Sequence, residues 1–281
     1  MADQKRPRSG SDAGKGRSGG SGRGGPPRGR SDAGGDRRHG GRASEPGRPP
    51  RRESGPRAPA IDDDVTGKEL DKAVRRELAT LDSGVAGTVA RHLVMVARLI
   101  DTDPEAAFAH AQHAKSRAGR VAVVREAAGE AAYTAGHFDE ALKEFTAARR
   151  ISGRDDLIAV IADCHRGVGR PDTAIALLDD PAVATLPVEV GSELAVVVAG
   201  ALRDTGRETE ALALLERAMP ASAPREQWVA RMQYALGDLL AEAGRTHEAV
   251  SAFASAESSD LDGDLDAGER VTELLEGHDS T

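Results

Sequence analysis

Apolar residues recur at three- and four-residue spacing through most of the chain beyond Ile61, which is the period of one face of an α-helix. In the clearest stretch this spacing predicts one helix over 123–136 and a second over 138–151, with Gly136 between them. Glycine often ends a helix because it adopts the left-handed conformation without a Cβ clash. The pattern therefore predicts a hairpin of two antiparallel helices.

The same arrangement occurs four times. Each copy reads Gly-x4-Ala, with a further apolar residue four positions after the alanine: Gly136, Ala141 and Phe145; Gly169, Ala174 and Leu178; Gly206, Ala211 and Leu215; Gly244, Ala249 and Phe253. A degenerate fifth copy at 102–114 places Ala107 in the alanine register, so that successive alanines lie 34, 33, 37 and 38 residues apart. Such a period predicts a solenoid of stacked helix pairs, with the alanines where two helices approach closely.

The repeat resembles the tetratricopeptide repeat (TPR) family. That family's pattern has a small residue in the first helix, glycine at the turn, alanine in the second helix, an aromatic four residues later and a closing proline. Residues 236–256 match it with Gly237, Gly244, Ala249 and Phe253, whereas the closing proline is mostly absent. The 123–151 copy matches nearly as well, with Gly129, Tyr133, Gly136, Ala141 and Phe145. The resemblance implies an all-α, right-handed superhelical solenoid of antiparallel hairpins, with repeats over about 84–257.

Two further helices flank the repeats within a helical domain at 61–281. Thr66 and Glu69 form a capping-box pattern ahead of a periodic apolar stretch, which predicts a capping helix at 66–81. A C-terminal helix at about 268–277 is expected to shield the other end of the stack. Pro181 stands where the other copies continue with alanine, so the second helix of that repeat should end near Asp179.

Residues 1–60 have a different composition. They contain no Leu, Val, Ile or aromatic residue and are rich in Gly, Pro, Ser and Arg. Such a segment cannot bury enough apolar surface to offset ordering entropy of roughly 1–2 kcal/mol per residue, so we expect a disordered tail.

Charge divides along the same boundary. The tail has a net charge of +9 and the remainder −17, within a formal total of −8. The tail could therefore engage an external polyanion, fold back on its own acidic domain, or act only as a solubilising linker. Its RGG- and RGR-like pieces leave RNA contact open, and with it the alternative of an RNA- or ribosome-associated factor.

Candidate chemistry is sparse. The one cysteine, Cys164, excludes an internal disulfide and is expected to be a small core residue. His110 and His113 are expected on a partly exposed second helix, and without a third ligand they predict no metal site. Residues 258–269 place Asp260 and Asp262 at calcium-loop positions, but Ser258 replaces the first ligand, so an acidic linker explains them as well. We predict no enzyme activity and no cofactor.

No apolar run reaches the roughly 18 residues that a membrane span needs, and no hydrophobic stretch follows the basic N-terminus. The expected location is the cytoplasm.

The resemblance to the tetratricopeptide repeat family implies a protein–protein interaction module or scaffold. Such a module binds a partner peptide or helix along the inner face of its first helices. The oligomeric state is left open, and the acidic domain favours a partner segment of basic or mixed charge. The family's groove positions fall on Glu126, Glu130, Tyr133, Asp163, Arg166, Arg203, Arg231, Tyr234 and Asp238. Tyr133 and Tyr234 are the only tyrosines in the chain, and either groove anchoring or half-buried packing explains them.

Overall fold

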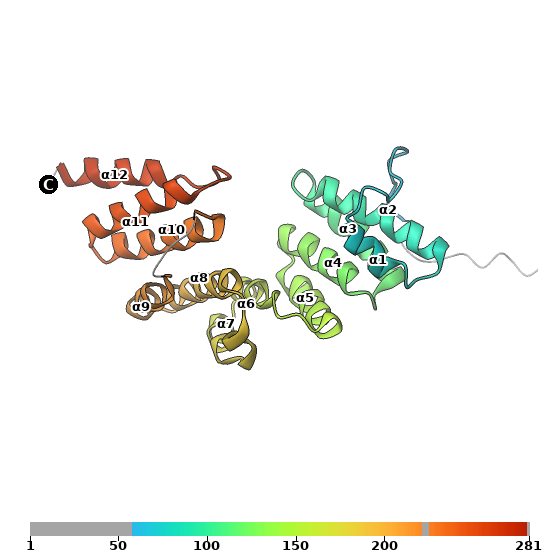
Figure 1. Cartoon of the computed structure of the whole chain (residues 1–281), viewed down its shortest axis with the longest axis horizontal. Helices are drawn as coiled ribbons and strands as arrows, with labels where there is room; N and C mark the ends of the chain where they lie inside the picture. Colours follow the sequence, from blue (N-terminus) through green and yellow to red (C-terminus); the bar gives the residue numbers. More distant parts are fainter. Residues whose placement is uncertain (1–57, 221–224, 280–281) are drawn as a thin grey trace, which may run out of the picture. The chain divides into compact units, whose positions relative to one another are not determined.

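The computed structural model describes residues 58–220 and 225–279, and within these ranges the chain forms helices and no strand (Figure 1). The α-helices are α1 (Lys72–Leu78), α2 (Ser83–Leu99), α3 (Pro104–Ala118), α4 (Ala122–Thr134), α5 (Phe138–Ser152), α6 (Ile158–Gly167), α7 (Pro171–Ala176), α8 (Val188–Asp204), α9 (Glu208–Ala218), α10 (Gln227–Glu242), α11 (Thr246–Ser259) and α12 (Ala267–Asp279). Two short 3-10 helices, η1 (Leu177–Asp179) and η2 (Pro181–Thr185), lie between α7 and α8.

Every described residue belongs to one compact unit. The disorder expected for 1–60 concerns mainly residues outside the described ranges, and it stays a prediction.

Within the described ranges, five hairpins follow one another: α2–α3, α4–α5, α6–α7, α8–α9 and α10–α11. Each of the last four closes at the glycine that the repeat pattern singled out. Gly136 has a φ of +75°, and beside it the His137 N–H donates to the Ala132 carbonyl over 2.8 Å. Equivalent bonds of 2.8–2.9 Å join Arg170 to His165, Arg207 to Leu202, and Arg245 to Leu240. This bond satisfies a carbonyl that the end of the helix would otherwise leave without a partner.

The α2–α3 hairpin closes without a glycine. Asp103 caps α3 by accepting a hydrogen bond from the Ala106 N–H over 3.0 Å, and Pro104 occupies the first helical position. Proline fits there because its missing N–H would have no helical partner in any case. The degenerate repeat at 102–114 is therefore a hairpin with a different turn.

Small residues allow the two helices of a hairpin to approach closely. Ala141 and Ala249 are fully buried, as the repeat pattern predicts. Phe145 lies on Gly129 and Phe253 on Gly237, so tightly that a Cβ atom at either glycine would stand only 2.8–2.9 Å from the ring. Each phenylalanine also belongs to an apolar cluster that reaches the next helix along the chain, α6 and α12 respectively.

The capping helix near the N-terminal end of the described residues is shorter than the sequence predicts. The helix expected at 66–81 spans only Lys72–Leu78, because Asp71 is its N-cap. Thr66 and Glu69 do contact each other, with the Thr66 N–H donating to the Glu69 carboxylate over 3.0 Å, but this contact closes a turn ahead of the helix.

The exposure expected for His110 is wrong. His110 is 3% exposed, and its Nδ1 lies 2.9 Å from the Nδ1 of His92 on α2. Helical periodicity places a residue on a face of its own helix and leaves the opposing residue unknown.

None of the helices in 58–220 and 225–279 combines the length and the apolar character that crossing a membrane requires.

Candidate functional site

The nine predicted groove residues all lie on first helices of successive hairpins. Glu126, Glu130 and Tyr133 are on α4, Asp163 and Arg166 on α6, Arg203 on α8, and Arg231, Tyr234 and Asp238 on α10. Within each helix their spacing of three, four or seven positions places them on one face. We refer to this face of α4, α6, α8 and α10 as the groove face.

Two cavities open along the groove face. The first, the Trp228 cavity, has a volume of about 250 Å³ and is lined by Tyr133, Ala159, Val160, Asp163, Glu193, Val196, Val197, Trp228 and Arg231. The second, the Tyr234 cavity, has a volume of about 330 Å³, and its lining includes Arg166, Arg203, Tyr234, Asp238 and Leu265. Val196 and Arg231 line both, so the two cavities adjoin. Seven of the nine predicted residues therefore border a cavity, and Glu126 and Glu130 border neither.

Polar bridges join neighbouring first helices along this face. Between α4 and α6, the Tyr133 hydroxyl donates to the Asp163 carboxylate. Loss of hydration and this hydrogen bond both raise the pKa of the tyrosine hydroxyl. Between α6 and α8, Arg166 donates from Nε to Asp204 over 2.8 Å, and it also donates to Asp163 on its own helix over 3.0 Å. The hydrogen bond to Asp204 is the main reason that the pKa of Arg166 is raised.

Gly200 on α8 makes room for the Arg166 side chain. A Cβ atom at Gly200 would stand 2.9 Å from the Arg166 guanidinium. The absence of a side chain at Gly200 thus lets the arginine cross from α6 to Asp204 at the far end of α8.

The bridges continue toward the C-terminus. Arg231 donates to Glu193 over 2.6 Å, and the Tyr234 hydroxyl donates to Asp266 over 2.6 Å. Arg203 and Glu242 are 3.5 Å apart, a further ion pair between α8 and α10. Each such partly exposed pair contributes on the order of 0–1 kcal/mol, so the row of pairs sets the register of the helices more than it stabilises them.

Arg270 on α12 is a groove residue that sequence reasoning missed. It donates to Asp238 over 2.7 Å, and its guanidinium lies 4.8 Å from the centre of the Phe253 ring. The residues of α12 were assigned only to a terminal cap. Treating α12 as the first helix of a further repeat would have placed Arg270 beside α10.

The two glutamates outside the cavities differ from each other. Glu126 forms an ion pair with Arg154 over 2.5 Å. Glu130 is exposed, and no cation of the described residues lies within ion-pair distance of it. Partial loss of hydration raises the pKa of the Glu130 carboxyl, and the Glu126 carboxylate adds to this rise.

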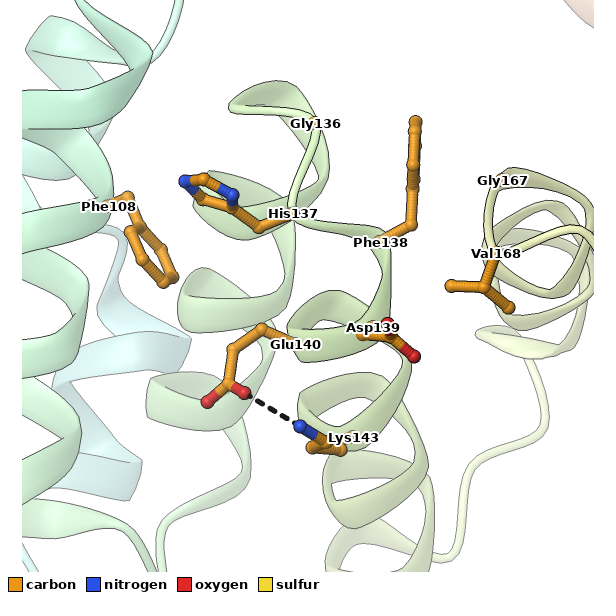
Figure 2. A pocket seen from close by; sticks show the side chains of 9 residues that line it. All are labelled: Phe108, Gly136, His137, Phe138, Asp139, Glu140, Lys143, Gly167 and Val168. Atoms are coloured by element: carbon orange, nitrogen blue, oxygen red, sulfur yellow. Dashed lines mark hydrogen bonds and ion pairs between the residues drawn. The ribbon is translucent and has the colours of Figure 1, made fainter.

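A larger cavity of about 560 Å³ lies at the turn of the α4–α5 hairpin (Figure 2). Figure 2 shows Phe108 and His137 on one side and Phe138 directed toward Gly167 and Val168 on the other. Three of the polar side chains here are paired: Lys143 with Glu140 over 3.2 Å, and His137 with Glu105 over 3.0 Å. The Phe138 ring also fills the space that a Cβ atom on Gly167 would need. These side chains serve the packing of adjacent hairpins, so we place the candidate site on the groove face.

Side chains outside the groove face that could act as a nucleophile or a metal ligand have structural roles instead. Cys164 is fully buried, and burial raises the pKa of its thiol to about 12, which leaves it a poor nucleophile. The Asp260 carboxylate accepts hydrogen bonds from the Gln227 amide over 2.7 Å and from the backbone N–H groups of Gly263 and Leu265 over 3.1 and 2.9 Å. This pattern favours a structural turn over a calcium ligand. In the described part of the chain, no three His, Cys, Asp or Glu residues are grouped as metal ligands.

No curated protein matches the chain. Among solved structures, it is similar to a thermophilic TPR protein of Thermus thermophilus, with 18% identity, a TM-score of 0.50, and coverage of 66% of this chain and 98% of that one. It is also similar to PilW, a widely conserved type IV pilus biogenesis factor, with 16% identity, a TM-score of 0.51, and coverage of 74% of this chain and 88% of that one. At these identities the likeness shows the fold alone.

The family model described as tetratrico peptide repeat matches residues 116–237 and 196–263, which together span more than half of the chain. These ranges hold the four glycine turns and all nine predicted groove residues. Together with the helix hairpins of the structure, they confirm the resemblance and the all-α fold. The chain is a member of the tetratrico peptide repeat family.

Proposed function

We propose that the groove face of α4, α6, α8 and α10 binds a segment of a protein partner, and that the protein acts as an interaction scaffold without catalysis. Arrays of this repeat are in general scaffolds for protein–protein interaction. Fold alone does not assign a function, so the proposal depends on the site.

The observation that supports it is the pair of adjoining cavities. They provide an apolar floor that includes Val160, Val196 and Leu265, under a rim of charged side chains such as Arg231. Apolar pockets supply most of the affinity for a partner, whereas a polar rim orients it and selects against other partners. A peptide or helix lying across α6, α8 and α10 would fill both cavities.

The alternative of an RNA- or ribosome-associated factor depends on residues 1–60, of which only the last three are described. It stays a prediction, as does the cytoplasmic location. Filter binding of RNA by the full chain and by a chain that starts at Ile61 would test the first.

The groove proposal is tested by filling the shared part of the cavities. The Val196→Trp variant should reduce capture of partner proteins from the native cell by about tenfold or more, because Val196 lines both cavities and a bulky side chain there obstructs the part that they share. The matched control is Val188→Trp on the same helix, since Val188 is 55% exposed and lines neither cavity. Quantitative mass spectrometry of the captured proteins gives the measurement, and circular dichroism confirms that both variants are folded. Equal capture by wild type and Val196→Trp would contradict the proposal.

A further inference from the structure

The Trp228 cavity differs from the Tyr234 cavity in its lining. Val160, Val196 and Val197 face it as half-buried aliphatic side chains, and Trp228 is 7% exposed. The indole N–H of Trp228 already donates to Glu226 over 2.8 Å. The indole therefore contributes apolar surface with no free donor.

The tyrosine at the edge of this cavity has no free donor either. Because the Tyr133 hydroxyl donates to Asp163, the donor is satisfied within the protein. A polar ligand group entering the cavity would lose its water and find few partners, whereas an apolar group would bury surface at roughly 25 cal/mol per Å². The cavity is thus suited to one apolar side chain of a bound segment.

The charged side chains of the groove face differ in whether they have an ion-pair partner. Each described arginine of the groove face already has a carboxylate: Arg166 has Asp163 and Asp204, Arg203 has Glu242, and Arg231 has Glu193. Glu130 has no such partner among the described residues, and it lies three positions before Tyr133 on the same face of α4.

An exposed carboxylate without a cation beside it favours a cationic ligand. Glu130 has no ion-pair partner among the described residues, so a positive charge brought beside it gains attraction without displacing another cation. An acidic ligand group would have to compete with the carboxylates that already pair with the arginines, and the Glu130 carboxylate would repel it. The charge pattern therefore selects against acidic segments as well as for basic ones.

We propose that the partner segment is a peptide that places an apolar side chain in the Trp228 cavity and a neighbouring lysine or arginine against Glu130. This inference rests on the proposed function of the groove and specifies the chemistry of its ligand.

The test is a selection from a phage-displayed random peptide library on the full chain, followed by titration of synthetic peptides with the selected sequences. Trp228 is the only tryptophan of the chain and lines the cavity, so its fluorescence reports binding there. We expect the selected peptides to combine an apolar residue with a nearby basic one. Replacing that basic residue by alanine should weaken binding to wild type by roughly tenfold and leave binding to Glu130→Gln unchanged.

Two further variants test whether the charge of residue 130 sets the preference for basic peptides. Glu130→Lys should reverse the preference and select acidic peptides. Glu189→Gln, an exposed glutamate on α8 that lines neither cavity, should keep the wild-type preference.

The outcomes separate the two proposals. Peptides whose binding Val196→Trp abolishes, but which show no basic preference or no response to Glu130→Gln, would overturn this inference and leave the groove function in place. If no peptide is selected, or if selected peptides bind equally well to Val196→Trp, both proposals are overturned.

Discussion

The hairpins α2–α3 and α10–α11 solve the same packing problem with different side chains. In α10–α11, the fully buried Phe253 lies on Gly237, and the turn closes at Gly244. In α2–α3, Ala111 stands four positions after the register alanine, and the buried rings are the imidazoles of His92 and His110. The α10–α11 hairpin therefore buries a ring that cannot ionise, whereas the α2–α3 hairpin buries, beside its aliphatic residues, two rings that are uncharged only while neither takes up an extra proton.

The imidazole pair makes the stability of the α2–α3 hairpin depend on pH. The two Nδ1 atoms are 2.9 Å apart, so one ring must carry the proton on Nδ1 and the other must accept it. Burial lowers the pKa of both histidines, and in His92 to about 4. His113, whose ring centre is 4.4 Å from that of His92, lowers both pKa values further. Arg91 and Arg117 also lower the pKa of His92, whereas Asp62 opposes the shift at His110.

The largest effect should come from Phe253→Ala, which removes the bulk of the α10–α11 hairpin. Truncating a buried phenylalanine lowers the free energy of unfolding by about 3–5 kcal/mol, because apolar burial is lost and a cavity remains. Hydrogen exchange resolved by segment should show the loss of protection in α10, α11 and α12, with a much smaller change in α2 and α3.

Leu275→Ala on α12 is the matched control, because Leu275 is 50% exposed and should change stability by about 0.5 kcal/mol or less. Equal losses in the two variants would contradict the role given to Phe253.

Acidification should give the next largest effect, and in the other hairpin. The folded pKa of His92 lies below the ordinary 6.5, so the unfolded chain binds the proton more tightly between these values. Stability is therefore intact above pH 6.5 and falls as the pH is lowered from 6.5 toward 4, by on the order of 3 kcal/mol for this group. Loss of exchange protection in α2 and α3 across this range is the measurement.

His92→Phe serves as the control for acidification, since a phenyl ring is apolar at every pH and cannot take up a proton. This variant should lose the His92 part of the pH dependence. If its α2 and α3 amides lose protection over the same range as wild type, His92 is not the acid-sensitive group.

The smallest effect should come from the turns. Gly244 has a φ of +72°, and a Cβ atom there would meet no neighbour within 4 Å, so Gly244→Ala tests backbone conformation alone. It should lower the free energy of unfolding by about 1–2 kcal/mol. Gly87 is an exposed residue in the second turn of α2, where Gly87→Ala should instead raise the free energy of unfolding by up to about 1 kcal/mol. Urea unfolding measures the free energy of unfolding of both variants. A destabilised Gly87→Ala variant would contradict the expected difference between the two glycines.

The sequence indicated on which helices the candidate site residues lie, but not which residues they contact. The resemblance to the repeat family assigned Arg166 and Arg231 to the groove face, but the carboxylates of the neighbouring helices that pair with them, Asp204 and Glu193, are each 38 residues away in the chain. Only the stacking of one hairpin on the next brings such residues together. For the same reason the sequence could not distinguish the paired arginines from Glu130, which the structure leaves without a cation among the described residues.

Local interactions explain what the sequence determined by itself. A turn at Gly136 or Gly244 depends on the backbone freedom of one residue, and a helix face depends on spacing within one helix, so both can be predicted from neighbouring residues. The enclosure of His110 by His92 and the two cavities that meet at Val196 depend on which helix lies opposite. Tertiary structure alone decided these, because side chains from distant segments meet only after the helices pack.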